Sequence, residues 1–169
     1  TTVAKDYACV EGWHTYTFKA VDAARNETVT DTMTVKIDTI KPVIGDAAFN
    51  EGYKNLWNWL IRKDSLEITI PVEEAGSGIE SVEYKLIPED SSTAGQPSVK
   101  KASVENRAGY KAVIYINPDF KGKIMITARD HAGNVSDTKM IGTDGSGIHG
   151  IIVEDHAPEI RFLVNGSES

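Results

Sequence analysis

Apolar and polar residues alternate along most of this chain, and Val, Ile, Thr and Tyr are abundant between segments rich in Pro, Gly, Ser and Asn. In residues 66–73 every second side chain is apolar, so one face of an extended strand can enter a core while the other faces water. Such alternation predicts an all-β protein. Strands are expected near Val43–Ile44 and over Leu66–Glu73, Val82–Leu86, Val99–Val104, Tyr110–Ile116, Lys123–Arg129 and Val135–Ile141.

About seven short strands are typical of a small antiparallel β-sandwich, whose two sheets bury their inner faces against each other. Pro71 lacks a backbone donor and is therefore expected at an edge or a bulge. The inward positions of the predicted strands form the expected core, namely Ile68, Ile70, Val82, Tyr84, Ile114, Ile126 and Ala128.

Part of this pattern occurs twice, at a constant separation of 108 positions. Both copies describe an apolar strand that ends in Asp and leads into a tight turn closed by Asn. Arg25 stands where the second copy has the turn glycine, which predicts either a left-handed Arg25 or a different turn. The matched pairs are Tyr16 with Ile124, Phe18 with Ile126, Ala20 with Ala128, Asp22 with Asp130, Ala24 with Ala132, and Asn26 with Asn134.

A second repeat, at a separation of 116 positions, relates residues 36–44 to residues 152–160 and aligns Pro42 with Pro158. A residue before Pro is pushed out of the helical region, so both segments are expected to be extended joints between domains. The repeats divide the chain into residues 1–41, the closing strands of one domain; residues 42–156, a complete domain; and residues 157–169, the first strand of another.

The formal net charge of −7 argues against a sequence-independent grip on nucleic acid or anionic lipid, which requires clustered Lys and Arg. The longest apolar runs are far shorter than the roughly 20 residues of a membrane span. Cys9 is the only cysteine, so neither a disulfide within the chain nor a thiolate pair for zinc is expected.

Three segments carry a resemblance to a known family. The strings Ile-Thr-Ala-Arg-Asp-His-Ala-Gly-Asn (126–134), Ser-Gly-Ile-Glu-Ser-Val-Glu-Tyr (77–84) and Asp-Thr-Ile-Lys-Pro (38–42) resemble the final hairpin, an inner strand and the linker of bacterial immunoglobulin-like domains. The resemblance implies an immunoglobulin-like sandwich in tandem modules of large, extracellular, often cell-wall-attached bacterial proteins. Such modules serve as stalks, spacers or adhesive units.

Asp22 and Asp130 stand where a strand enters a turn, and a short carboxylate there accepts hydrogen bonds from the turn's backbone. This structural role is the default expectation, with no cofactor required. The alternative is Ca²⁺ that stiffens the joints, because calcium takes scattered oxygen ligands. Its candidate ligands are Asp22, Asp38 and Asp46 at the first joint, and Asp130, Glu154 and Asp155 at the second.

Trp57 and Trp59 would project to one face of an extended strand, where indole rings can stack on a sugar or a partner protein. The alternative is a short strand or helix that caps the sandwich and buries them. The four histidines share no metal-ligand spacing, and no pattern of nucleophile, base and acid is recognisable, so an enzyme is not expected.

The sequence thus favours a non-catalytic extracellular module that acts as a spacer or stalk in a bacterial surface protein. Its partners would be the neighbouring immunoglobulin-like domains, and also a host or cell-surface protein or glycan. Two alternatives stay open: an adhesin or carbohydrate-binding unit that uses Trp57 and Trp59, and an accessory domain of a secreted glycan-active enzyme.

Overall fold

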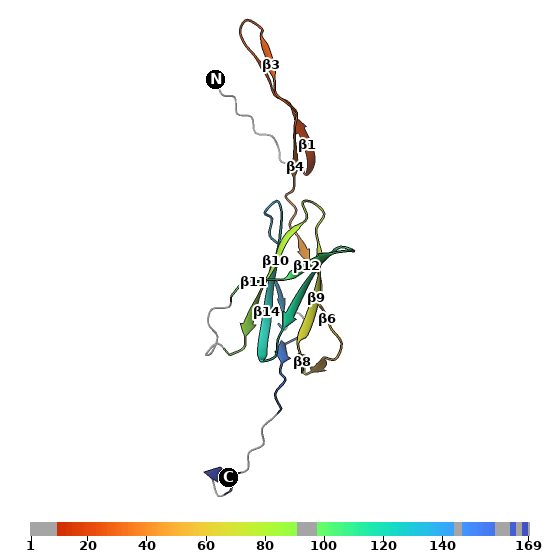
Figure 1. The fold of residues 1–169 in the computed structure, drawn as a ribbon, viewed down its shortest axis with the longest axis vertical. Coiled ribbons are helices and arrows are strands. Elements are labelled where there is room, and N and C mark those ends of the chain that lie inside the picture. The colour runs from red at the N-terminus through yellow and green to blue at the C-terminus, as the bar shows by residue number, and fades with distance from the viewer. Residues whose placement is uncertain (1–9, 91–97, 144–146, 158–162, 165–166, 169) are drawn as a thin grey trace.

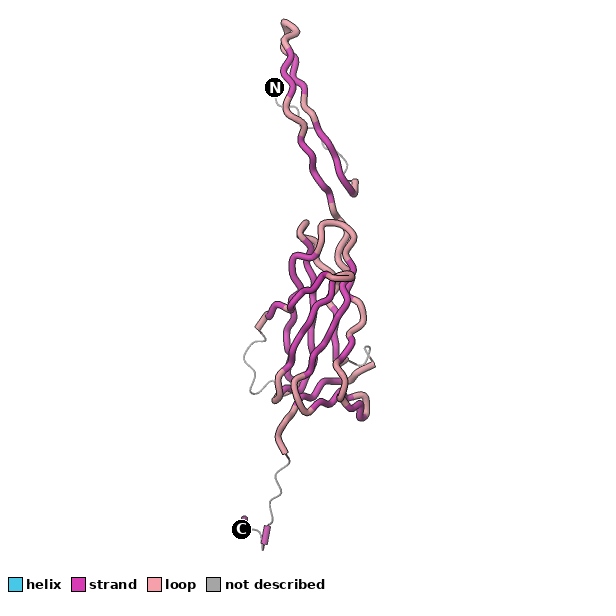
Figure 2. The backbone as a smooth tube through the Cα atoms, turned by 45° about the vertical axis from the view of Figure 1, so that its right-hand side comes forward, coloured by secondary structure: helices cyan, strands magenta, loops and turns pink. Residues whose placement is uncertain are grey.

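The fold is that of a computed structural model, which describes residues 10–90, 98–143, 147–157, 163–164 and 167–168. These residues form strands, turns and loops, and none of them lies in a helix (Figure 2). The prediction of an all-β protein is confirmed. Cys9 and most of residues 157–169, the predicted first strand of another domain, lie outside the described residues.

Two sheets pack against each other in the main body of the molecule. The larger has the order β11-β10-β14-β16-β8-β7, with β15 also paired to β14, and the smaller has the order β12-β13-β9-β5, with β6 also paired to β9. The strands of the larger sheet are β7 (Lys54–Leu56), β8 (Trp59–Arg62), β10 (Ile79–Pro88), β11 (Lys100–Lys101), β14 (Phe120–Asp130), β15 (Lys139–Ile141) and β16 (Gly150–Val153). Those of the smaller are β5 (Val43–Ile44), β6 (Ala48–Phe49), β9 (Leu66–Glu73), β12 (Ser103–Asn106) and β13 (Tyr110–Ile116).

The hydrophobic core lies between the two sheets. Along β9 the buried side chains alternate with more exposed ones, as period-two patterning requires. All seven predicted core residues are buried, so the predicted strand faces are correct. Each large aliphatic side chain removed from water contributes about 1.5–3 kcal/mol before conformational entropy is subtracted.

Pairing is antiparallel throughout the described strands except between β8 and β16, which run parallel with Gly150 opposite Trp59 and Val153 opposite Arg62. The sequence predicted only antiparallel pairing. Segments that far apart along the chain are not joined by a tight hairpin, so nothing local requires them to run in opposite directions. The segment before Leu66, which contains Trp57 and Trp59, contributes two strands, β7 and β8, to the larger sheet.

The edge of the smaller sheet is broken opposite Pro71 of the neighbouring strand, β9. Ile44 pairs with Val72 and Ala48 pairs with Thr69, so β5 and β6 flank a break opposite Pro71. In that break the amide of Gly45 donates to the carbonyl of Pro71 at 2.8 Å. Pro71 thus lies on an internal strand, but at the point where the neighbouring edge strand is broken and no donor is needed.

A separate two-stranded ribbon precedes the sandwich. β1 (Gly12–Tyr16) pairs with β4 (Met33–Ile37), and β2 (Lys19–Val21) pairs with β3 (Glu27–Val29). Figure 1 shows the ribbon extending from one end of the sandwich, while the chain after β16 leaves from the other end. Two short strands, β17 (Leu163–Val164) and β18 (Ser167–Glu168), pair near the C-terminus.

Candidate functional site

The two copies of the repeated turn have the same hydrogen bonds. The carboxylate of Asp22 accepts from the backbone amide of Asn26 at 2.8 Å and from its side-chain amide at 2.7 Å. Asp130 accepts the same two bonds from Asn134, both at 2.8 Å. The predicted structural role of Asp22 and Asp130 is present in both turns, and hydrogen bonding by Asn26 lowers the pKa of Asp22.

Arg25 and Gly133 occupy equivalent left-handed positions, with φ of 67° and 95°. The amide of each donates to the carbonyl of its own turn Asp. The turn therefore keeps its shape without a glycine in the first copy. Left-handed φ costs a non-glycine residue roughly 1–2 kcal/mol, so Arg25 carries a modest strain that Gly133 avoids.

Only the second turn meets the linker, at a cluster of three segments that we call the entry joint: Asp38, the loop Gly76–Gly78 and the turn Asp130–Asn134. The side-chain amide of Asn134 donates to the carbonyl of Asp38 at 3.0 Å, and the amide of Ala132 donates to the hydroxyl of Ser77 at 3.1 Å. The linker is thus hydrogen-bonded to the end of the sandwich from which it emerges.

The Asp38 carboxylate lies directly over the Gly76–Gly78 loop. It accepts from the amide of Ser77 at 2.6 Å and from the amide of Ile40 at 3.1 Å. A Cβ added to Gly76 would stand 2.3 Å from the Asp38 carboxyl carbon, so this approach requires glycine. Hydrogen bonding by the Ser77 side chain is the largest cause that lowers the pKa of Asp38, and Lys36 also favours the charged form.

Three carboxylates converge at the entry joint, because Asp38, Glu74 and Asp130 each offer an oxygen within 4.8 Å of the others. Asp38 and Asp130 are buried. One oxygen of Glu74 accepts from the amide of Gly76 at 2.6 Å, while the other is buried without a hydrogen-bond partner. Such an arrangement concentrates negative charge and leaves an oxygen free to bind a cation.

Sequence reasoning placed Asp38 and Asp130 at different joints, yet they lie at the same one. β14 runs back toward the entry end, so the turn that follows it meets the linker that precedes the sandwich. Glu74 was not predicted to take part. Its position directly after β9 and two residues before Gly76 is the signal that could have identified it.

The other predicted calcium ligands lie elsewhere. Asp22 is in the ribbon turn, and Asp46 forms an ion pair with Lys139 at 2.7 Å. Asp155 lies near Asp119 and His156 at the exit end, in an exposed group. Glu154 is exposed, and its backbone amide donates to the carbonyl of Arg62 at 3.0 Å. The six candidates therefore do not form the two predicted sets.

Trp57 and Trp59 have different surroundings. Trp57 is 85 % exposed in the turn between β7 and β8, whereas Trp59 is partly buried in β8. The Trp59 ring packs on the backbone of Gly150, with the His149 ring 5.3 Å and the Lys121 ammonium 5.1 Å from its centroid. The prediction that Trp57 and Trp59 share one face required a single extended strand through both residues. Trp57 lies in a turn and only Trp59 lies in a strand, so this prediction is wrong.

No known family model matches the chain, and no curated protein sequence is significantly similar to it. Within the described part of the chain there is no helix with the length and apolar character of a membrane span.

Proposed function

We propose that this chain contains a non-catalytic immunoglobulin-like module that acts as a structural spacer in an extracellular, cell-wall-attached bacterial protein. The observation that carries the proposal is the arrangement of the two ends of the sandwich. The linker is hydrogen-bonded to one end, and the chain leaves from the other (Figure 1). A module built this way transmits direction from one neighbour to the next.

The strand order supports the immunoglobulin-like assignment. With β7, β8 and β11 set aside as additions, renaming the other strands of the sandwich A to G in chain order turns β5/β6-β9-β13-β12 into A-B-E-D, and β10-β14-β15/β16 into C-F-G. Immunoglobulin-like domains have this strand order, ABED in one sheet and CFG in the other, which supports the proposal. The ribbon has the same turn as the sandwich, and this repetition supports tandem modules. At the equivalent position before the turn, Phe18 of the ribbon is 51 % exposed, whereas Ile126 of the sandwich is fully buried.

The last strand of the sandwich is placed to resist tension. β16 is paired on both sides, with β14 and with β8, and the chain leaves the sandwich at its end. Tension along the long axis would load these ladders in shear, so that several hydrogen bonds must break together. Single-molecule stretching of the full chain should therefore give one abrupt extension of roughly 350 Å as the sandwich unfolds.

Two glycine substitutions separate this mechanical role from general stability. Gly150→Ala places a Cβ 2.3 Å from the Trp59 ring and should lower the unfolding force by disturbing the β8–β16 ladder. Gly109→Ala strains only the turn between β12 and β13, where Gly109 has φ of 95°, and should leave that force nearly unchanged. Extension in small steps at low force, or equal effects of both variants, would contradict a spacer that withstands tension.

A second proposal is that Ca²⁺ binds at the entry joint and stiffens it. The convergence of Asp38, Glu74 and Asp130 supports it, as does the unpartnered buried oxygen of Glu74. A cation would offset the mutual repulsion of these carboxylates. A ligand that binds only the folded state stabilises it by mass action, so Ca²⁺ should raise the Tm and EDTA should reverse the change.

Glu74→Gln is the matched variant for the calcium test, because the amide keeps an oxygen acceptor but removes a charge. It should abolish the Ca²⁺-dependent rise in Tm, whereas Glu73→Gln on the neighbouring exposed position should not. Identical melting curves of the unmodified chain in Ca²⁺ and in EDTA would reject the calcium proposal and leave the spacer proposal standing.

A further inference from the structure

The ribbon and the sandwich share more than a turn, because their closing strands pair in the same register. β1 pairs with β4 as β14 pairs with β15 and β16. The separation between matched positions is 108 up to β15 and 116 from β16 on, and the difference is the length of segment 142–149, which has no counterpart in the ribbon. The matched backbone pairs are Tyr16–Met33 with Ile124–Ile141, Trp13–Lys36 with Lys121–Ile152, and Gly12–Ile37 with Phe120–Val153.

The shared register identifies the counterpart of each residue at the two ends of the sandwich. A slip of one residue would turn every side chain to the other face, so residues that correspond in register also correspond in position. Asp38, directly after β4, corresponds to Glu154, directly after β16, and both stand four positions before a Pro. Glu11, directly before β1, corresponds to Asp119, directly before β14.

Both linkers are held by the carboxylate that precedes the neighbouring strand. Glu11 accepts from the backbone amide of Thr39 at 2.7 Å and from its hydroxyl. At the exit end an oxygen of Asp119 lies 3.0 Å from Nδ1 of His156, one position beyond the counterpart of Thr39. The exit linker therefore leaves its sheet with the same kind of support as the entry linker.

Asp38 and Glu154 differ in what they meet. Asp38 is buried, its carboxylate accepts from the amide of Ser77, and its carbonyl accepts from the side chain of Asn134. Glu154 is exposed, and among the described residues its carboxylate has no hydrogen-bond or ion-pair partner. One joint is thus complete, whereas the corresponding acceptor at the other end is free.

The donors of the entry joint suit any linker that supplies an acidic residue at this position. The backbone amide of Ser77 requires only a carboxylate, and the side-chain amide of Asn134 requires only a main-chain carbonyl. Glu154 offers both acceptors. A hydrogen bond to a charged acceptor is stronger than one between neutral groups, so the carboxylate contributes most to such a contact.

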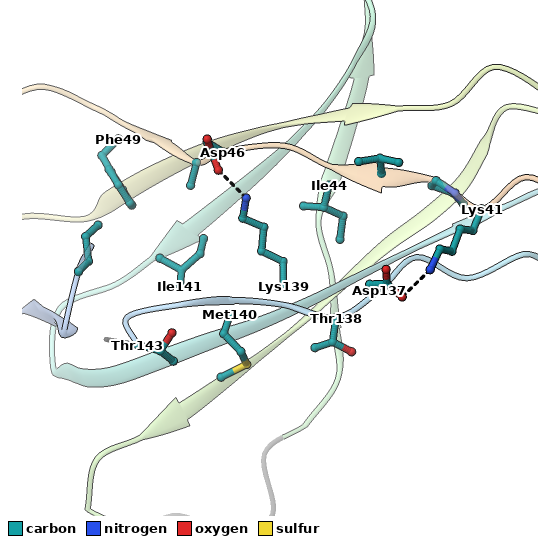
Figure 3. Close-up of a pocket in the computed structure, with 14 residues that line it drawn as sticks. Lys41, Ile44, Asp46, Phe49, Asp137, Thr138, Lys139, Met140, Ile141 and Thr143 are labelled. Atoms are coloured by element: carbon teal, nitrogen blue, oxygen red, sulfur yellow. Dashed lines mark hydrogen bonds and ion pairs between the residues drawn. The ribbon is translucent and has the colours of Figure 1, made fainter. Parts of the chain in front are cut away.

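Two contacts of the entry joint have no counterpart at the exit. Lys36 donates to a carbonyl of the entry-joint loop at 2.5 Å, and Lys41 forms an ion pair with Asp137 at 2.6 Å. That ion pair lies at one end of a groove between the edge formed by β5 and β6 and the edge formed by β15 (Figure 3). Ile152 and Ala157 stand at the corresponding exit positions and can form neither contact. An exit joint is therefore expected to be weaker than the entry joint.

We propose that Glu154 docks on the entry end of a following module that has the same loop and turn as this sandwich. Its carboxylate accepts from the loop amide equivalent to that of Ser77, and its carbonyl accepts from the turn residue equivalent to Asn134. The inference rests on the spacer function proposed above and adds the contact that orients one module on the next.

A chain in which residues 42–157 occur twice in tandem gives Glu154 this partner, because Pro42 of the second copy then follows Ala157 as Pro158 does in the natural order. With the second copy alone isotopically labelled and EDTA present, NMR measures hydrogen exchange at its Ser77 amide. Glu154→Ala in the first copy should speed this exchange by about tenfold or more, because the charged acceptor is lost. Glu154→Asp, which has the side chain of the entry joint, should keep the exchange slow.

Glu105→Ala in the first copy is the matched control, since it removes an exposed Glu from β12 and should leave the exchange unchanged. Exchange that is equally fast with Glu154 and with Glu154→Ala would overturn the docking proposal, as would equal effects of Glu154→Ala and Glu105→Ala. Stretching the same tandem chain separates the two proposals. Two abrupt extensions combined with fast exchange would reject the docking of Glu154 and leave the spacer function standing, whereas extension in small steps at low force would overturn both.

Discussion

The side chain of Asn134 is hydrogen-bonded to the main-chain carbonyl of Asp38, 96 positions earlier, at a distance of 3.0 Å. The same amide group also closes the Asp130 turn at 2.8 Å. One side chain therefore completes a local turn and holds the linker against it. Asn26, its equivalent in the ribbon, closes the corresponding turn with Asp22.

This arrangement predicts the effect of removing the amide. Asn134→Ala should weaken the hold on Asp38, and hydrogen exchange at the Ser77 amide should speed up by up to about tenfold, since one hydrogen bond contributes about 0.5–1.5 kcal/mol. Asn26→Ala removes the equivalent side-chain hydrogen bond to Asp22 in the ribbon and should leave Ser77 exchange unchanged. Equal exchange in all three proteins would mean that Asn134 does not stabilise the joint.

Acid should loosen the entry joint through Asp38. Hydrogen bonding by Ser77 lowers the pKa of Asp38 below its ordinary value of 3.8. A lowered folded pKa means that the stabilisation is fully present above the ordinary value and is lost as the pH falls through the lowered one. The NMR shift of the Ser77 amide should therefore titrate below pH 3.8, and Asp38→Asn should remove this titration. A midpoint above that value would contradict the hydrogen-bonding account.

Core packing gives a comparison between the two copies of the repeat. Ile126→Ala should destabilise the sandwich by about 2–5 kcal/mol in denaturant unfolding, because it deletes buried methyl groups and leaves a cavity. Phe18→Ala changes the equivalent position of the ribbon, where the side chain is 51 % exposed, and should leave the unfolding of the sandwich unaffected. A loss below about 0.5 kcal/mol for Ile126→Ala would be inconsistent with full burial.

The two turns should respond in opposite directions to substitution at the left-handed position. Gly133 has φ of 95° and open space where a Cβ would stand, so Gly133→Ala should cost roughly 1–2 kcal/mol through backbone strain alone. Arg25→Gly should relieve strain in the ribbon, although the greater freedom of glycine in the unfolded chain offsets part of that gain. Thermal unfolding followed by circular dichroism measures the first effect, and amide exchange at Asn26 the second.

The entry joint shows how far the candidate site could be predicted. Asp38 and Asp130 were identified from their positions before Pro42 and before a turn. Their meeting at one joint depends on the direction of β14, and the participation of Glu74 depends on where β9 ends. A sequence pattern reflects neighbours along the chain, whereas this cluster joins three segments through sheet pairing.

The sequence by itself determined the elements whose causes are local. Period-two alternation specified the faces of β9, β10, β13 and β14, and the repeated Asp and Asn specified two turns with the same hydrogen bonds. Tertiary structure alone decided the parallel pairing of β8 with β16, the exposure of Trp57 and the groove beside β15. These features depend on which strand edges meet after collapse, and the free energy of that choice comes from contacts between residues far apart in the chain.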